Sequence, residues 1–411
     1  MDRKWLMFFV LVSLIGIVFL SGCTSQQPVP TPTASPTVTV QPTAAPKIYS
    51  QAEADAIVQW RQLWTDHAVW TRMYIIESLN NSSAANDAAA RLLKNQEDIG
   101  NAIKPYYGDA AGDKLTALLK EHILIAVAII NDVKAQNATA QAADEAKWTQ
   151  NADEIAAFLS SANPNWRTGD ARDLMHMHLA TTKTELVARY SKDYPADVIA
   201  WDAVYDHILT MSDAISGGII KQFPDKFAGP KVFSQKEVDL NKDMRKLWTD
   251  HTVWTRLYII ESLNNSSAAD EAAARLLKNQ EDIGNAIKPV YGDAAGTQLT
   301  SLLKEHITIA VAIINDVKAQ NATAQAVDEA RWVKNADEIS VFLAGANPYW
   351  PLPAVKDMMH MHLSTTKDEL VARYTMNYPA DVKAYDVVYS HILEMSDTLS
   401  NGIAQQFPEK F

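Results

Sequence analysis

The sequence predicts an all-α protein made of two tandem up-and-down helical bundles, which follow a signal peptide and a disordered Pro/Thr-rich linker. The first observation is a duplication, because residues 61–110 and 245–294 are identical at 44 of 50 positions, at an offset of 184. A period this long indicates a duplicated domain rather than a solenoid repeat. The second is that apolar residues recur with a period of 3.6 while strand signals are nearly absent.

Six helices are expected in the first copy, and the second copy should repeat them. Their breaks carry the Asn, Ser, Pro and Gly residues that cap or interrupt helices. The length of the segments favours four main helices plus shorter ones in each bundle. The expected helices lie near 51–80, 84–104, 110–136, 140–161, 170–191 and 195–222.

The N-terminus has the pattern of an export signal. Arg3 and Lys4 precede an apolar run over residues 5–20, which is short for a membrane-spanning helix. The Leu-Ser-Gly-Cys that ends at Cys23 resembles the lipobox of secreted lipoproteins. This resemblance implies removal of residues 1–22 and lipidation of Cys23, whereas an uncleaved anchor is the alternative. In either case we expect a protein held at the cell membrane and facing outside the cytoplasm.

The domain limits follow from the leader and the duplication. Residues 23–48 are expected to comprise the lipidated Cys and a Pro/Thr-rich linker, whose composition favours an extended spacer over a packed core. The two bundles are expected over 49–227 and 237–411, joined by a linker over 228–236. The chain also contains sequons for asparagine-linked glycosylation, which suit an exported protein. The candidate acceptors are Asn80, Asn81, Asn137, Asn264, Asn265 and Asn321.

Composition narrows the function classes. The net charge of −12 argues against a nucleic-acid partner, because phosphate binding requires a basic surface. The single cysteine excludes a disulfide framework and a cysteine-based zinc site.

The ten histidines form five pairs at the repeat offset, and several of them lie within apolar helical stripes. On the expected bundle, histidines from four different helices fall at similar heights, which is how helical bundles build metal and haem sites. The cofactor is unknown, with a metal ion or haem as the candidates. The candidate ligands are His67, His122, His178 and His207, with His251, His306, His362 and His391 in the second copy.

Two alternatives stand beside a cofactor site. The histidines can instead be hydrogen-bonded core residues, since the paired Glu-x-x-His motifs of di-iron bundles are missing. A catalytic di-metal oxidase is the least favoured possibility, and we assign no catalytic residues.

A dense group of large side chains opens each bundle. It favours either an aromatic ligand pocket with an arginine that binds an anion, or an aromatic core whose arginine pairs with an acid such as Glu77 or Asp98. The residues concerned are Trp64, Trp70 and Arg72, and Trp248, Trp254 and Arg256.

Each copy, over 63–227 and 247–411, resembles a family of small single-domain helical proteins from bacteria and archaea. In the first copy the shared motifs read LWTDHAVWTR, NADEIAAFL, NPNW and GIIKQFPDKF. The resemblance implies a helical fold without pointing to an activity. The opening around His67 is also faintly similar to ferritin-like and hemerythrin-like bundles.

These observations favour a non-enzymatic binding or interaction module of the cell envelope, whose protein or small-molecule partner is unknown. The alternative function is a bundle that binds a metal ion or haem for storage, redox chemistry or sensing.

Overall fold

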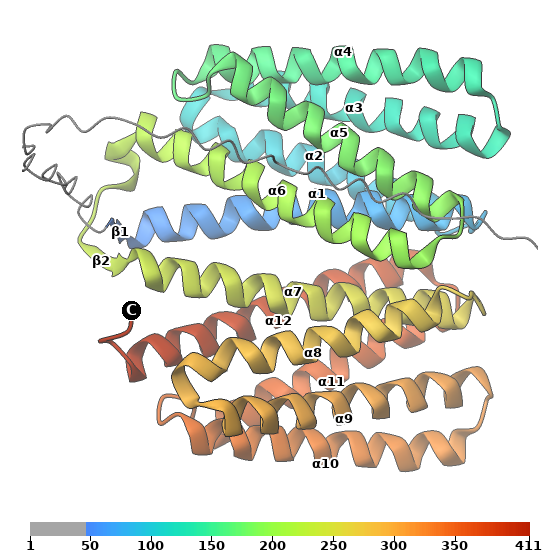
Figure 1. Cartoon of the computed structure of the whole chain (residues 1–411), viewed down its shortest axis with the longest axis vertical. Helices are drawn as coiled ribbons and strands as arrows, with labels where there is room; N and C mark the ends of the chain where they lie inside the picture. The colour runs from blue at the N-terminus through green and yellow to red at the C-terminus, as the bar shows by residue number, and fades with distance from the viewer. Residues whose placement is uncertain (1–46) are drawn as a thin grey trace, which may run out of the picture. The chain divides into compact units, whose positions relative to one another are not determined.

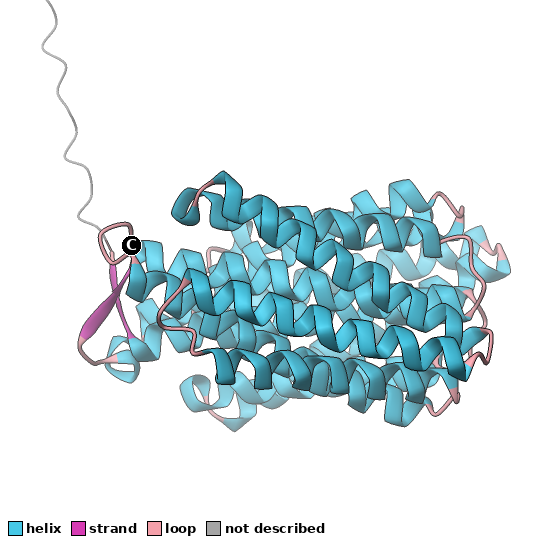
Figure 2. Cartoon of the chain, turned by 90° about the horizontal axis from the view of Figure 1, so that it is seen from below, coloured by secondary structure: helices cyan, strands magenta, loops and turns pink. Residues whose placement is uncertain are grey.

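The structure, a computed structural model, describes residues 47–411, which are almost entirely helical (Figures 1 and 2). The all-α prediction is confirmed. The predicted signal peptide, Cys23 and nearly all of the Pro/Thr-rich linker lie outside the described residues. None of the helices in the described part of the chain is both long and apolar enough to span a bilayer.

The two copies have the same order of elements. The first contains β1 (Ile48–Ser50), α1 (Gln51–Leu79), α2 (Ala85–Tyr107), α3 (Asp109–Ala135), α4 (Ala138–Ala162), α5 (Thr168–Tyr190), α6 (Tyr194–Gln222) and a 3-10 turn (Pro224–Phe227). The second contains β2 (Lys231–Ser234), α7 (Gln235–Leu263), α8 (Ala269–Tyr291), α9 (Asp293–Lys318), α10 (Ala322–Ala346), α11 (Leu352–Tyr374) and α12 (Tyr378–Gln406).

All six helices of each copy are long, rather than four long and two short. The shortest has 23 residues and the longest has 29. All six helices can be long because the connections between them are short. Single residues in the left-handed region of backbone conformation are enough to reverse the chain. Asn81 and Lys192 have φ values of 53° and 57°, and Gly108 has a φ of 82°.

Each copy begins earlier than its first predicted helix. The sequence KIYSQ at 47–51 recurs as KVFSQ at 231–235, again at the offset of 184. These equivalent segments form an antiparallel pair, β1 with β2, in which Tyr49 lies opposite Phe233. Antiparallel pairing of two equivalent segments relates the copies by a pseudo-two-fold axis. The predicted linker over 228–236 therefore carries a strand and the start of α7.

The first turn of α1 is tied to this strand pair. Ser50 caps α1 in a capping box with Glu53. The Ser50 hydroxyl donates to the Phe227 carbonyl at 2.7 Å, and Lys231 forms an ion pair with Glu53. The start of the second copy is thus attached to the start and end of the first.

Each helix packs on the next along the chain, and the last helix of each copy returns to pack on the first, α6 on α1 and α12 on α7. The copies meet through α1 with α7, α2 with α12, and α6 with α8 (Figure 1). Residues 46–411 form one compact unit.

The unit has two ends, which we name for the residues found there. The sheet pole holds β1, β2 and the C-terminus (Figure 2). The asparagine pole holds the loops 80–84 and 264–268, which follow α1 and α7 (Figure 1). At about 1.5 Å per residue, the 29 residues of α1 separate the poles by about 43 Å.

Candidate functional site

Three of the predicted histidines meet in the core of the first copy. His67 on α1, His122 on α3 and His178 on α5 are each at most 3% exposed. The Nε2 atoms of His67 and His178 lie 3.4 Å apart. The ring of His178 also stacks against that of His122, with centroids separated by 5.8 Å.

The second copy repeats the cluster. His362 lies between His251 and His306, with ring centroids separated by 5.5 Å and 5.9 Å. We call these two groups the histidine clusters: His67, His122 and His178, and His251, His306 and His362.

The fourth predicted histidine of each copy makes a different contact. His207 on α6 donates from Nε2 to the Leu174 carbonyl at 2.9 Å. His391 on α12 donates to the Met358 carbonyl at 2.8 Å. A carbonyl partner on the neighbouring helix therefore occupies the Nε2 of each of these histidines.

The hydrogen bonds of His122 fix its tautomer. Its Nδ1 lies 2.8 Å from Oδ1 of Asn151, and the Asn151 amide nitrogen donates to the Leu118 carbonyl. Because Oδ1 accepts, Nδ1 carries the proton, and Nε2 holds a lone pair. This Nε2 is buried without a partner among the described residues. His306 and Asn335 repeat the arrangement.

Burial keeps these imidazoles neutral. Desolvation, with a smaller contribution from His122, lowers the pKa of His67 from 6.5 to about 3. Desolvation also lowers the pKa of His122 to about 4 and that of His178 well below its usual value. Neutral imidazoles suit metal binding and hydrogen bonding, but not charge pairing. Within residues 47–411, however, no three His, Cys, Asp or Glu side chains are arranged to hold a metal ion.

Arg72 faces carboxylates instead of a ligand cavity. Its guanidinium is 2% exposed, donates to Glu185 at 2.6 Å and binds both oxygens of Asp197 at 3.0 and 2.9 Å. The alternative of an arginine paired with an acid is therefore confirmed. The acids are not Glu77 or Asp98, because the partners lie more than 110 residues away on α5 and α6.

The predicted partner acids have other roles. Glu77 binds Arg373 of the second copy at 2.7 Å, and Asp98 pairs with Lys94 at the surface. The equivalent contact, from Arg189 to Glu261, also crosses between the copies. We call the two resulting groups the ion clusters. Their members are Arg72, Arg189, Glu185, Asp197 and Glu261, and Arg256, Arg373, Glu369, Asp381 and Glu77.

Each ion cluster has two arginines and three carboxylates, so one carboxylate is in excess. Burial, opposed by Arg72 and reinforced by Asp197, raises the pKa of Glu185 from 4.5 to about 7. The pKa of Glu369 is raised to about 7 in the same way. Both clusters therefore hold a proton more tightly than an exposed glutamate does.

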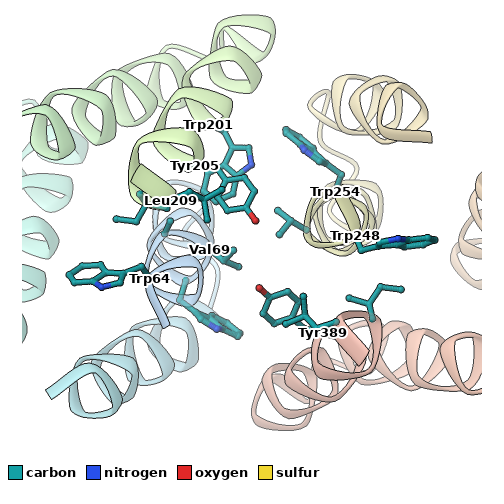
Figure 3. Close-up of a cluster of buried hydrophobic side chains, with 14 of the residues drawn as sticks. Trp64, Val69, Trp201, Tyr205, Leu209, Trp248, Trp254 and Tyr389 are labelled. Carbon is teal, nitrogen blue, oxygen red and sulfur yellow. The ribbon is translucent and has the colours of Figure 1, made fainter. Parts of the chain in front are cut away.

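The predicted tryptophans divide between two environments. Trp64 lies beside His67, with ring centroids 5.6 Å apart, and Trp248 lies beside His251 in the same way. Trp70 instead packs edge-on against Tyr385 of the other copy at 5.7 Å. In the apolar centre of this interface, Val69, Trp201 and Tyr205 of the first copy face Trp254 and Tyr389 of the second (Figure 3).

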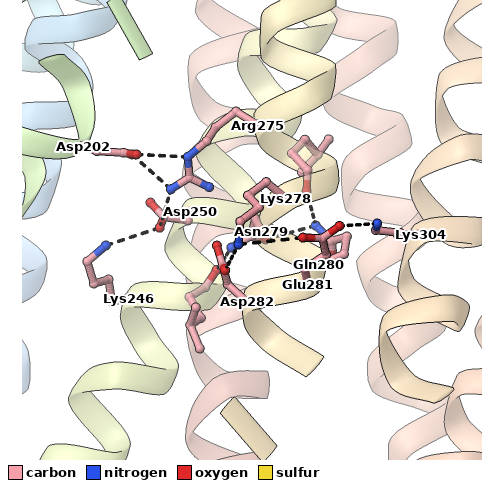
Figure 4. A network of polar contacts seen from close by, with 12 residues as sticks. Asp202, Lys246, Asp250, Arg275, Lys278, Asn279, Gln280, Glu281, Asp282 and Lys304 are labelled. Carbon is pink, nitrogen blue, oxygen red and sulfur yellow. Dashed lines mark hydrogen bonds and ion pairs between the residues drawn. The ribbon is translucent and has the colours of Figure 1, made fainter. Parts of the chain in front are cut away.

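Partly exposed ion pairs surround this centre. Arg275 binds Asp202 of the first copy at 3.0 Å and approaches Asp250 of its own copy at 3.4 Å (Figure 4). The equivalent residues repeat the contact, and they are Arg91, Asp386 and Asp66. Burial raises the pKa of Asp66 to about 7, although Arg91 opposes the shift.

A polar pocket opens at the asparagine pole between the copies, and sequence reasoning did not find it. Its volume is about 610 Å³. The available signal in the sequence is the repeated NNSS segment, which a helix break or a sequon explains without a pocket. The lining residues are Asn80, Ser82, Ser83, Lys192, Tyr194, Asn264, Asn265, Ser266, Ser267 and Tyr378.

The six sequon asparagines all lie at this pole. The loops after α1 and α7 carry four of them, and Asn137 and Asn321 cap α4 and α10 (Figure 1). All six are exposed.

No known protein family, curated protein or solved structure matches this chain.

Proposed function

We propose that this protein is a lipid-anchored module of the cell envelope that binds a ligand or partner through its asparagine pole. The observation that carries the proposal is the opposition of the two poles. The described chain starts at the sheet pole, and the polar pocket lies at the other end of α1 and α7. The proposal includes membership of each copy in the family of small helical proteins that its motifs resemble.

The predicted anchor supports this orientation. A lipid on Cys23 would fix the chain to the membrane, and residues 24–46 would connect it to the sheet pole. A Pro-rich spacer extends by about 3.1 Å per residue, so these 23 residues reach up to about 70 Å. The tether would then join the folded unit at the end opposite the pocket, which leaves the pocket free for a ligand.

The chemistry of the pocket supports binding rather than catalysis. Amides, hydroxyls, phenols and one amine line it, without a carboxylate or an imidazole. Such groups fix and orient a polar ligand, whereas acid–base catalysis generally uses a group that titrates near neutral pH.

The anchor and the orientation are tested together on intact cells. Cys23 is the only cysteine, so a lipidated chain has no free thiol and a new cysteine is a unique label site. We expect Ser83→Cys to react with a membrane-impermeant maleimide, while the buried control Ala156→Cys does not. Cys23→Ser should release the chain from the membrane fraction. Labelling of Ser83→Cys only after cell lysis would refute the proposal.

A second candidate function is metal binding, favoured by one distance. A tetrahedral metal ion with nitrogen ligands at about 2.0–2.1 Å holds them about 3.4 Å apart, which is the separation of Nε2 in His67 and His178. The unpartnered Nε2 of His122 is a further lone pair in the same cluster.

Metal analysis and an absorption spectrum of the full-length protein test this second function, with purification free of chelators and histidine tags. We expect about one metal ion or haem per copy, lost in His67→Leu/His251→Leu. It should be retained in His176→Leu/His360→Leu, which alters exposed histidines. A colourless, metal-free wild type would leave the clusters as core residues.

A further inference from the structure

We propose that the pocket at the asparagine pole binds a carbohydrate, one molecule per chain, on the pseudo-two-fold axis. This inference rests on the proposed function and names the class of ligand.

The polar groups of the pocket have few partners inside the protein. Among the described residues, no hydrogen bond engages the side chains of most of the lining residues. Amides and hydroxyls both donate and accept hydrogen bonds, as do the hydroxyls of a sugar. The side chains concerned are Asn80, Ser83, Tyr194, Asn264, Asn265, Ser267 and Tyr378.

The two tyrosine rings are held in place by the ion clusters. The guanidinium carbon of Arg189 lies 5.1 Å from the ring centroid of Tyr194, and Arg189 is itself bound to Glu261. Arg373 lies 5.0 Å from the ring of Tyr378 in the same way. Aromatic rings give the C–H face of a sugar an apolar surface.

Each ring therefore depends on an ion pair between the copies. Tyr194 is positioned through Glu261 of the second copy, and Tyr378 through Glu77 of the first. The pocket is complete only when both copies are packed together.

The charge of the lining limits the ligand. A pocket without carboxylates does not suit a cation, and one lysine does not suit a polyanion. The lysine is Lys192, whose equivalent in the second copy is Met376. The ligand class is thus a neutral saccharide, or one with a single acid group directed at Lys192.

The sugar has two potential sources, since Asn80, Asn81, Asn264 and Asn265 are themselves sequon acceptors around the pocket. The saccharide is either free or attached to the chain. Full-length protein from a host without N-glycosylation presents an unmodified pocket, and protein from the native cell shows by mass spectrometry whether these asparagines carry glycans.

The test is a binding titration of that unmodified full-length protein, in a detergent without a sugar headgroup. The probes are chitotriose, maltotriose, mannotriose and galacturonic acid. We expect at least one probe to bind with a stoichiometry of one per chain. Tyr194→Ala and Tyr378→Ala should each weaken its binding by about tenfold or more. Tyr190→Ala, a control on the exposed face of α5, should leave binding unchanged.

More conservative substitutions separate the contributions of the tyrosine ring, the tyrosine hydroxyl and Lys192 to sugar binding. Tyr194→Phe keeps the ring and removes the hydroxyl, so it should weaken binding less than Tyr194→Ala. Lys192→Met should reduce the affinity for galacturonic acid without affecting neutral sugars. The absence of binding by every probe at millimolar concentration, or equal binding by the tyrosine variants, would overturn the proposal.

A glycan found on the native asparagines, together with binding in the unmodified protein, would identify an attached sugar as a natural occupant. The maleimide experiment is read from labelling before and after cell lysis, because a sugar in the pocket would shield the thiol equally in both samples. If Ser83→Cys is labelled on intact cells but no sugar binds, only the carbohydrate proposal fails. If Ser83→Cys is labelled only after cell lysis, the envelope function fails whatever binds in solution.

Discussion

The histidine clusters lie inside the copies and the ion clusters lie between them, and the two respond to protons in opposite directions. Burial lowers the pKa of His67, His122 and their equivalents, whereas it raises the pKa of Glu185 and Glu369. In both places burial disfavours the charged form. The same desolvation thus makes acid destabilise the interior of each copy and stabilise the contact between copies.

The direction in which each group changes stability with pH follows from the linkage between protonation and folding. A histidine whose folded pKa is lowered contributes stability above pH 6.5, and this is lost as the pH falls toward the folded value. A glutamate whose folded pKa is raised contributes stability below pH 4.5, and this is lost as the pH rises through about 7. Between about pH 4.5 and 6.5 the histidines and the glutamates oppose one another, so wild-type stability should change less there than the histidines alone dictate.

The largest expected effect comes from removing an arginine of an ion cluster. Arg72→Met leaves Glu185 and Asp197 buried without their main counter-charge, and should lower the free energy of unfolding by about 3–5 kcal/mol. Urea unfolding at neutral pH measures the change. Arg61→Met, which breaks a partly exposed pair with Asp213, should cost about 1 kcal/mol or less. Equal losses in the two variants would contradict the role of burial.

The excess carboxylates are the next test. In Glu185→Gln/Glu369→Gln the stability lost between pH 4.5 and 7 should shrink by up to about 3 kcal/mol per site, since each pKa unit corresponds to about 1.4 kcal/mol. Thermal unfolding across this range measures it. Glu154→Gln, at an exposed position on α4, is the control. An unchanged pH profile would show that neither glutamate holds a proton in the folded protein.

The histidine clusters should give the opposite dependence of stability on pH. His178→Leu removes a buried base, so the variant should lose less stability on acidification, by about 2 kcal/mol at pH 5. The midpoint of acid unfolding, followed by circular dichroism, should move to lower pH. His176→Leu, two residues away and exposed, should not move it. A shift to higher pH would mean that His178 is charged in the folded state.

The smallest effect is expected at the edge of the interface. Arg91→Gln leaves Asp66 without its partner, but a carboxyl whose pKa is already about 7 can take up a proton instead. The loss should stay near 1 kcal/mol at pH 6 and increase toward pH 8. Unfolding at the two pH values measures the difference. A loss of stability as large as that of Arg72→Met would show that ion pairs at the edge of the interface contribute as much as the buried ion clusters.

The helices were predictable because the residues at their own ends determine where they begin and end. Asn80, Gly108 and Asn163 each end or separate helices through their own backbone and side-chain chemistry, so the expected boundaries agree with the structure to within a few residues. The meeting of His67, His122 and His178 was predictable too, since helix periodicity and rise fix the face and height of a side chain.

The partners of Arg72 were not predictable in this way, because Glu185 and Asp197 become neighbours only through packing. The contact between the copies was also missed, although α1 carried a signal for it. Its residues Val69, Trp70, Met73, Ile75 and Ile76 are all buried and surround the helix. A helix that is apolar all round is covered on every side, so α1 required a second covering surface that its own copy does not provide.

The pairing of β1 with β2 has a mechanical consequence. Any tension transmitted along an N-terminal tether reaches the folded unit at Lys47, whose carbonyl accepts a hydrogen bond from the backbone of Gln235 at the start of α7. Backbone bonds of an antiparallel pair run perpendicular to the strands, so a pull along β1 loads several of them at once in shear, rather than opening them one by one. Together with the bond from Ser50 to Phe227, they distribute the force over both copies before either first helix begins to unwind.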